Sequence, residues 1–109
     1  MRWYETIISA HTSVTDSVSH NEKLHSDRYF VWGETGANDL EAGNLHVEKA
    51  VTGYTDLYTK QEFDPWKEQI EEAFDAAGIA WVLNSTQYEE ETGLTHYEWY
   101  WEVTDDAEG

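Results

Sequence analysis

The chain contains no cysteine, a single proline, and only six Lys and Arg residues among its 109 residues. Without cysteine there is no disulfide framework and no thiolate chemistry, and the redox compartment stays open. The sequence has 23 Asp and Glu residues against these few cations, which gives a formal net charge of -17. Such a charge argues against direct nucleic-acid binding, because that binding depends on neutralising phosphates with Lys and Arg. Basic protein partners suit the sign better.

Long apolar runs are also missing. No segment approaches the length of a membrane span, and the first 18 residues do not have the pattern of a signal peptide, so we expect a soluble intracellular protein. The hydrophobic fraction of 39% and the aromatic fraction of 15% indicate a folded domain with an aromatic-rich core. The length suits one domain, residues 1–103, and the polar, acidic residues 104–109 are expected to form a disordered tail.

The clearest structural signal is a strand followed by a helix. Residues 51–60 are rich in Thr, Tyr and Val, which favour strands. Asp64 and Pro65 then predict the start of a helix, with Asp64 as its cap, and Gly78 predicts its end. Apolar side chains recur on one face of this helix at helical spacing and must be buried against neighbouring strands: Trp66, Ile70, Ala73, Phe74 and Ala77.

The other segments are assigned by their periodicity. We expect a first helix over residues 2–18, an exposed connection over 19–27, and strands over 28–32, 45–60, 79–88 and 94–103. Gly53 predicts a bulge or bend in the second strand. The last strand alternates most clearly, and its Tyr97, Trp99, Trp101 and Val103 side chains are assigned to the core with Trp66, Phe74 and Trp81. The predicted class is α+β, a mainly antiparallel four-stranded sheet packed by two helices in the order helix, strand, strand, helix, strand, strand.

The sequence shows no recognisable catalytic motif. It lacks a nucleophile elbow, a Gly-rich phosphate loop and a metalloprotease helix, so we expect a protein that is not an enzyme and has no cofactor. Metal binding is not expected either, because the histidines do not have the spacing of a zinc site and the acidic turn lacks a calcium-loop pattern. Those histidines are His11, His20, His25, His46 and His96.

Two acidic segments and one set of tyrosines are candidates for partner binding. The segment from Gly33 to Asn44 is longer than a simple reversal needs, and it is either a binding loop or a solvated loop without a partner. The acidic turn between the last two strands is the other segment. The candidate residues of these loops are Glu34, Asn38, Asp39, Glu41, Glu89, Glu90 and Glu91. Tyr54, Tyr58 and Tyr100 either form an exposed aromatic interface or are scattered single tyrosines.

The order of elements and the second half of the chain resemble the tail terminator proteins of long-tailed bacteriophages, also called tail-to-head joining or tail completion proteins. The residues that carry the resemblance are the strand Tyr54–Lys60, the amphipathic helix ending in Ala-Ala-Gly-Ile79, and the closing hairpin Gln87–Trp99. A helix at the start, residues 28–32 and the long polar loop match the first half more loosely.

This resemblance implies a ring, usually a hexamer, that caps the tail tube, ends its polymerisation and later contacts the head connector. The implied partners are the tail tube protein and the head-connector protein. The implied locations are the virion tail and, during assembly, the host cytoplasm. Part of the negative charge, from the Gly33 to Asn44 segment or the Glu89 to Glu91 turn, is then expected to face the lumen, where it would repel passing DNA. The alternative is a small acidic inhibitor that mimics DNA, of the anti-restriction or anti-CRISPR type.

Overall fold

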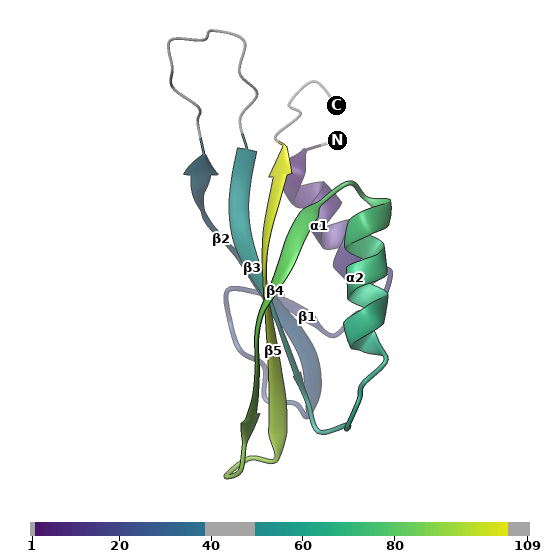
Figure 1. Cartoon of the computed structure of the whole chain (residues 1–109), viewed down its shortest axis with the longest axis vertical. Helices are drawn as coiled ribbons and strands as arrows, with labels where there is room; N and C mark the ends of the chain where they lie inside the picture. Colours follow the sequence, from purple (N-terminus) through teal and green to yellow (C-terminus); the bar gives the residue numbers. More distant parts are fainter. Residues whose placement is uncertain (1, 39–49, 105–109) are drawn as a thin grey trace, which may run out of the picture.

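A computed structural model describes residues 2–38 and 50–104 of the chain, and it confirms the predicted α+β class. The elements in chain order are α1 (Trp3–Thr12), β1 (Val18–His20), β2 (Arg28–Asn38), β3 (Ala50–Thr59), α2 (Trp66–Ala76), β4 (Ala80–Glu89) and β5 (Leu94–Thr104). Both helices lie on the same side of one long, twisted sheet (Figure 1).

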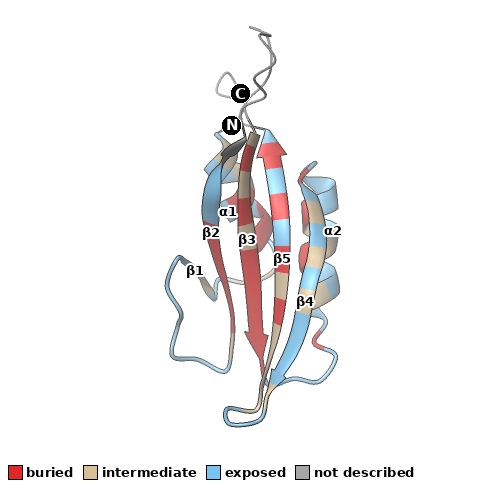
Figure 2. Ribbon diagram, turned by 60° about the vertical axis from the view of Figure 1, so that its left-hand side comes forward, coloured by how far each residue is buried: buried red, intermediate tan, exposed pale blue. Residues whose placement is uncertain are grey.

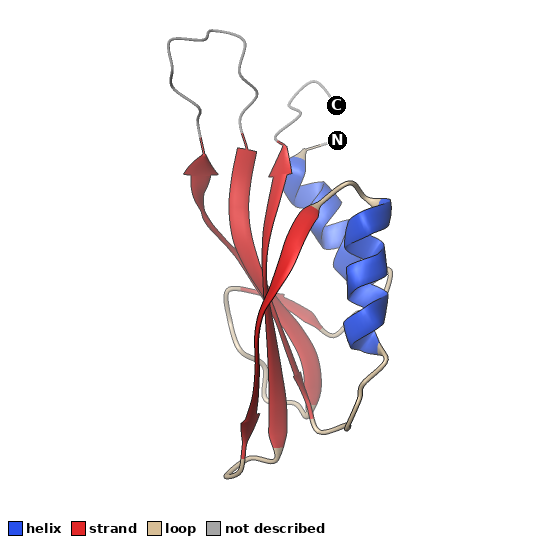
Figure 3. Ribbon diagram, viewed as in Figure 1, coloured by secondary structure: helices blue, strands red, loops and turns tan. Residues whose placement is uncertain are grey.

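The sheet has five strands in the order β1-β2-β3-β5-β4, so the predicted four-stranded sheet is wrong by one strand. The additional strand is β1, which spans the predicted end of the first helix at Val18 and the start of the segment that we expected to be an exposed connection. It pairs parallel with β2, from Val18 beside Phe30 to His20 beside Trp32, whereas the other pairs are antiparallel (Figure 3). Three residues are too few to show a strand period in the sequence, so only the pairing reveals this strand.

The first helix is shorter than predicted and ends at Thr12 instead of residue 18. Hydroxyl side chains at its end donate to helix carbonyls: Thr12 Oγ1 to Ile8 O at 3.0 Å and Ser13 Oγ to Ala10 O at 2.7 Å. Such local bonds compete with continued helix formation, and the following Val14 and Thr15 are β-branched. Val14 and Val18 still pack on the core, but Val18 does so from β1.

The predicted long loop after residue 32 is also partly wrong, because β2 continues to Asn38. Its pairing partner β3 is described from Ala50 onwards, and the predicted start at residue 45 lies outside the described part of the chain, as do residues 39–49. At the same end of the sheet, Thr104 pairs with Ala50 and belongs to β5, while the predicted tail residues 105–109 lie outside the described residues.

Gly53 is not the site of the bulge. It pairs with Glu34 and Trp101, and the register shift lies in the neighbouring strand, between Glu34 and Gly36. A side chain at Gly53 would collide with the Trp101 ring and with the backbone oxygen of Gly33. Glycine is therefore required here so that a tryptophan ring can lie flat on the strand.

The main core lies between the helices and the inner face of the sheet. Figure 2 shows the alternation along β5, whose inward residues Tyr97, Trp99, Trp101 and Val103 are buried as predicted. Phe74 and Ile70 of α2 are fully buried against them, while Trp66 and Trp81 are half-buried at the edge of this core. The start of α2 agrees with the prediction to within one residue: the helix begins at Trp66, directly after Pro65, and Asp64 Oδ1 accepts the Trp66 N–H at 2.9 Å. Gly78, with φ +74, follows its last turn.

Candidate functional site

The helices cover one face of the sheet, and the opposite face, here called the open face, carries the predicted tyrosines. Tyr54 and Tyr58 of β3 and Tyr100 of β5 all point to this side, as their even positions and pairing register require. The three residues therefore share a face, but their surroundings differ along it.

One half of the open face is covered by the chain itself. Tyr58 stacks between Tyr29 at 5.1 Å and His96 at 4.3 Å, measured between ring centroids, and the Lys23 ammonium lies 5.2 Å from its ring. The Leu24 backbone, in the connection between β1 and β2, lies beside the Tyr29 phenol and partly offsets the rise in the pKa of Tyr29 that burial causes. Tyr58 is consequently only 4% exposed, so it has little surface to offer a partner.

The other half of the open face has no cover among the described residues. We call it the open patch, and it consists of Thr52, Tyr54, Val82, Glu98, Tyr100 and Glu102. Tyr100 is 47% exposed and Val82 is 57% exposed, and they face each other across β5 and β4. A shallow hollow of about 590 Å³ lies over this end of the sheet, between Thr52, Val82, Tyr100 and Glu102. Apolar and aromatic side chains that lie next to one another on an exposed face, with polar residues around them, are found at protein-binding surfaces.

Carboxylates surround the aromatic rings of this face. Glu98 accepts a hydrogen bond from Asn84 Nδ2 at 2.9 Å, and the Glu102 side chain makes no hydrogen bond or ion pair with the described residues. Burial raises the pKa of Tyr54, and the charges of Asp56, Glu34 and Glu98 raise it further. The pKa of Tyr58 is raised far above its usual range, first by burial and then by Asp56 and other acidic neighbours. The tyrosines therefore stay neutral inside a negative field.

Asp56 lies at the border between the covered half and the open patch. Its Oδ1 is 3.0 Å from His96 Nε2, and both side chains are mostly buried. The two groups are not aligned for a hydrogen bond, so neither atom has a hydrogen-bond partner among the described residues. The contact is an ion pair when His96 is protonated.

The open patch continues onto a free strand edge. β4 is the last strand of the sheet, and no backbone group on its outer side pairs with another described segment. Its sequence, AWVLNSTQYE, contains no Lys or Pro and only one charged residue, Glu89. Proteins usually protect long edge strands with charges or proline, so an unprotected edge is a surface for pairing with another chain. A bulge between Leu83 and Ser85 is the one irregularity in its pairing with β5.

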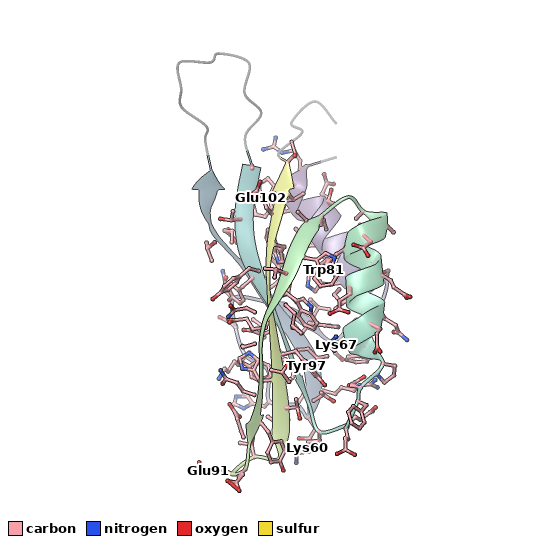
Figure 4. The ribbon with its side chains drawn as sticks, in the orientation of Figure 1. Lys60, Lys67, Trp81, Glu91, Tyr97 and Glu102 are labelled. Carbon is pink, nitrogen blue, oxygen red and sulfur yellow. The ribbon has the colours of Figure 1, made fainter. Side chains whose placement is uncertain are left out.

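The predicted loop residues do not form one site. Glu34 lies in β2, where its Oε1 is 2.7 Å from His20 Nε2, and this hydrogen bond is the main cause of its lowered pKa. Asn38 ends β2, and Asp39 and Glu41 lie outside the described residues. Glu89, Glu90 and Glu91 are at the turn between β4 and β5, at the opposite end of the sheet from Glu102 (Figure 4).

Four residues of the open patch were not among the sequence-based candidates: Thr52, Val82, Glu98 and Glu102. The alternation of the last strand did place Glu98 and Glu102 on the same face as Tyr100, so a signal for these two was present. Val82 gave no such signal, because its proximity to Tyr100 depends on the register between β4 and β5.

The described residues contain no group of His, Asp and Glu side chains suited to holding a metal ion. None of the helices within residues 2–38 and 50–104 is both long and apolar enough to cross a membrane. The sequence matches no protein-family model, and no curated protein is significantly similar to it.

Proposed function

We propose that the protein is a structural subunit that caps a bacteriophage tail tube as a ring, ends its polymerisation and joins the tail to the head. The observation that carries this proposal is the open patch together with the free edge of β4. An exposed surface with a hollow of about 590 Å³, and no metal-binding cluster among the described residues, favours an assembly role. The family resemblance of the sequence supplies the identity of the assembly.

A ring requires a head-to-tail contact between two different surfaces of the same subunit. Two such surfaces lie at opposite edges of this sheet. The first is the edge of β4 with the open patch. The second is a groove of about 450 Å³ between α1 and the β1 edge, and it includes the exposed side chains of Tyr4 and Ile8. Two dissimilar surfaces at opposite edges support repeated association in one direction around a ring.

The acidic DNA mimic is the second candidate. The observation in its favour is the charge of the open face. It carries four acidic side chains but a single described Lys or Arg, which is Lys23; the acidic residues are Asp56, Glu89, Glu98 and Glu102. A basic channel of a nucleic-acid-binding protein would attract such a face. The aromatic residues between these carboxylates fit less well, because a row of phosphates has no apolar groups at these positions.

The two candidates differ in assembly. We expect light scattering over a range of concentrations to detect a ring-sized species, or the protein to cap tubes at a uniform length when mixed with the tail tube protein of the same phage. A strict monomer or dimer that leaves tube polymerisation unchanged would contradict the terminator proposal. Strong, salt-sensitive binding to a basic nuclease would then support the inhibitor.

A substitution in the open patch sharpens this experiment. Val82→Lys places a charged side chain on an exposed strand position, and we expect it to reduce ring formation and tube capping. Ala76→Lys adds the same charge to the exposed last turn of α2 and is the matched control, with assembly unchanged. Circular dichroism of both variants checks that the fold is retained. Equal assembly by the two variants would exclude the open patch as a ring contact.

A further inference from the structure

The open patch brings aromatic rings and carboxylates together on one exposed face. Tyr100 lies between Glu98 and Glu102 on the same strand and the same face, so one ring has a carboxylate on each side along the strand. Tyr54 is opposite Tyr100 on β3. The patch therefore combines flat aromatic surface with negative charge.

No described cation is available to neutralise this patch. Arg2 lies near the Tyr4 ring, Arg28 pairs with Asp64, Lys60 with Asp27, Lys67 with Glu71, and Lys23 covers Tyr58. Each of the Lys and Arg residues in ranges 2–38 and 50–104 is thus engaged away from Glu98 and Glu102. None of the described residues therefore supplies the complementary positive charge.

The molecule itself shows which cation suits an aromatic ring beside a carboxylate. The guanidinium of Arg28 lies 3.7 Å from the centroid of the Trp66 ring and donates to both oxygens of Asp64, at 2.8 and 2.6 Å. A guanidinium is planar, so it can stack on a ring and bind a carboxylate with two donors at the same time, whereas an ammonium cannot. The open patch repeats the same pair of groups without the arginine.

We propose that the open patch binds an arginine-bearing segment of a protein partner, with a guanidinium stacked on Tyr100 and hydrogen-bonded to Glu98 or Glu102. The free edge of β4 lies beside the patch, so an extended segment can pair with this edge while its alternate side chains reach the patch. This inference rests on the proposed function to the extent that both require this face to dock a protein. A patch-to-patch contact between two copies of the chain is disfavoured, because two negative patches repel each other. The head-to-tail contact of the proposed ring does not bring two patches together.

The test uses the isotope-labelled full chain and three short peptides, blocked at both ends. The first is a hexapeptide of alternating arginine and threonine; the second has lysine and the third has uncharged citrulline in place of arginine. We expect the arginine peptide to shift the amide resonances of Val82, Tyr100 and Glu102 at about 20 mM salt and to dissociate when salt is raised to about 300 mM. We expect the lysine peptide to bind roughly three- to ten-fold more weakly than the arginine peptide, and the citrulline peptide not to bind.

Matched variants separate the patch from the overall charge. Glu98→Gln with Glu102→Gln removes two charges from the patch, and Glu68→Gln with Glu72→Gln removes two from the exposed side of α2. Tyr100→Thr removes the patch ring, and Tyr88→Thr removes a ring that is 64% exposed elsewhere on the sheet. We expect only the two patch variants to weaken binding of the arginine peptide, by roughly three- to ten-fold each.

Several results would overturn this inference. They are equal affinity for the lysine and arginine peptides, equal effects of the patch and control variants, or resonance shifts centred on α2. Each variant's own amide spectrum shows whether it is folded, so loss of structure cannot be mistaken for loss of binding. If the arginine peptide does not bind but the protein caps tubes normally, the proposed function stands and this inference fails. If the peptide binds but the protein does not cap tubes, this inference stands and the proposed function fails.

Discussion

His11 and Thr55 meet in the centre of the core, with His11 Nε2 2.9 Å from Thr55 Oγ1, although 44 residues separate them in the chain. His11 Nδ1 lies 2.7 Å from the Ile7 carbonyl oxygen, which only accepts, so Nδ1 carries the proton. The Thr55 hydroxyl therefore donates to Nε2, and it accepts from Trp101 Nε1 at 2.9 Å. This chain of hydrogen bonds ties α1 to β3 and β5 and requires a neutral imidazole.

The buried imidazole makes stability depend on pH. Burial lowers the pKa of His11 to about 4, from 6.5 in the unfolded chain, despite the opposing hydrogen bond to Ile7. Between these two pKa values the unfolded state binds more protons than the folded state. The stability that the buried, neutral His11 contributes is therefore complete above pH 6.5 and falls as the pH decreases towards 4. We expect a loss of about 3 kcal/mol from this group.

Urea unfolding at several pH values measures this effect. His11→Gln keeps a donor and an acceptor but does not titrate, so its stability should fall less steeply below pH 6.5 than that of the parent chain. His25→Gln, at an exposed position, should leave the slope unchanged. Parallel curves for the parent chain and His11→Gln would contradict the assignment of a neutral, buried His11.

Asp64 is the second polar group on which the fold depends. It is 1% exposed, and it accepts from Arg28, from the Trp66 N–H and from Thr59 Oγ1 at 2.7 Å. Burial alone would raise the pKa of Asp64, but these hydrogen bonds and the Arg28 charge outweigh it, so the pKa is lowered. This stabilisation is present above pH 3.8 and disappears as the pH falls through the lower, folded value.

We expect Asp64→Asn to reduce the free energy of unfolding at pH 7 by about 3 kcal/mol, because it leaves Arg28 without its partner. Asp27→Asn is the control, since the Asp27–Lys60 pair is mostly exposed and 3.5 Å long, and it should cost less than about 0.5 kcal/mol. Chemical denaturation of both variants provides the comparison. Similar losses for the two would show that the buried pair contributes no more than a surface pair.

Gly53 and Gly36 should respond differently to the same substitution. Gly53→Ala brings a methyl group into the Trp101 ring and the Gly33 backbone, and we expect a loss of about 1–3 kcal/mol. Gly36→Ala meets no atom within 4 Å, so it should be neutral or slightly stabilising. Thermal unfolding distinguishes them, and a neutral Gly53→Ala would mean that the Trp101 ring has room to move.

Phe63 combines two unfavourable features, a φ of +55 and a side chain that is 86% exposed. A left-handed conformation costs a residue with a side chain about 1–2 kcal/mol, and the exposed ring gains little in return. Phe63→Gly should therefore raise the midpoint of thermal unfolding. Phe63→Ala removes the same ring but keeps the strain, so it should stabilise less than glycine; equal effects would place the cost in the ring instead of the backbone.

The sequence by itself determined the α+β class, the helix that begins after Asp64, and the inward face of the last strand. Each of these depends on interactions between near neighbours, such as capping, helical spacing and alternation. It also placed Glu98, Tyr100 and Glu102 on one face, because that follows from alternation alone.

Only the tertiary structure decided what pairs across long separations. The three residues of β1 form a strand because they pair with the edge of β2. The bulge between Glu34 and Gly36 lies in the strand that pairs with Gly53. The burial of Tyr58 and the exposure of Tyr100 also differ for a tertiary reason. The connection between β1 and β2 folds over one half of the open face and leaves the other half without cover among the described residues. No local sequence pattern predicts that difference, because it depends on where the connection between β1 and β2 packs in the folded protein.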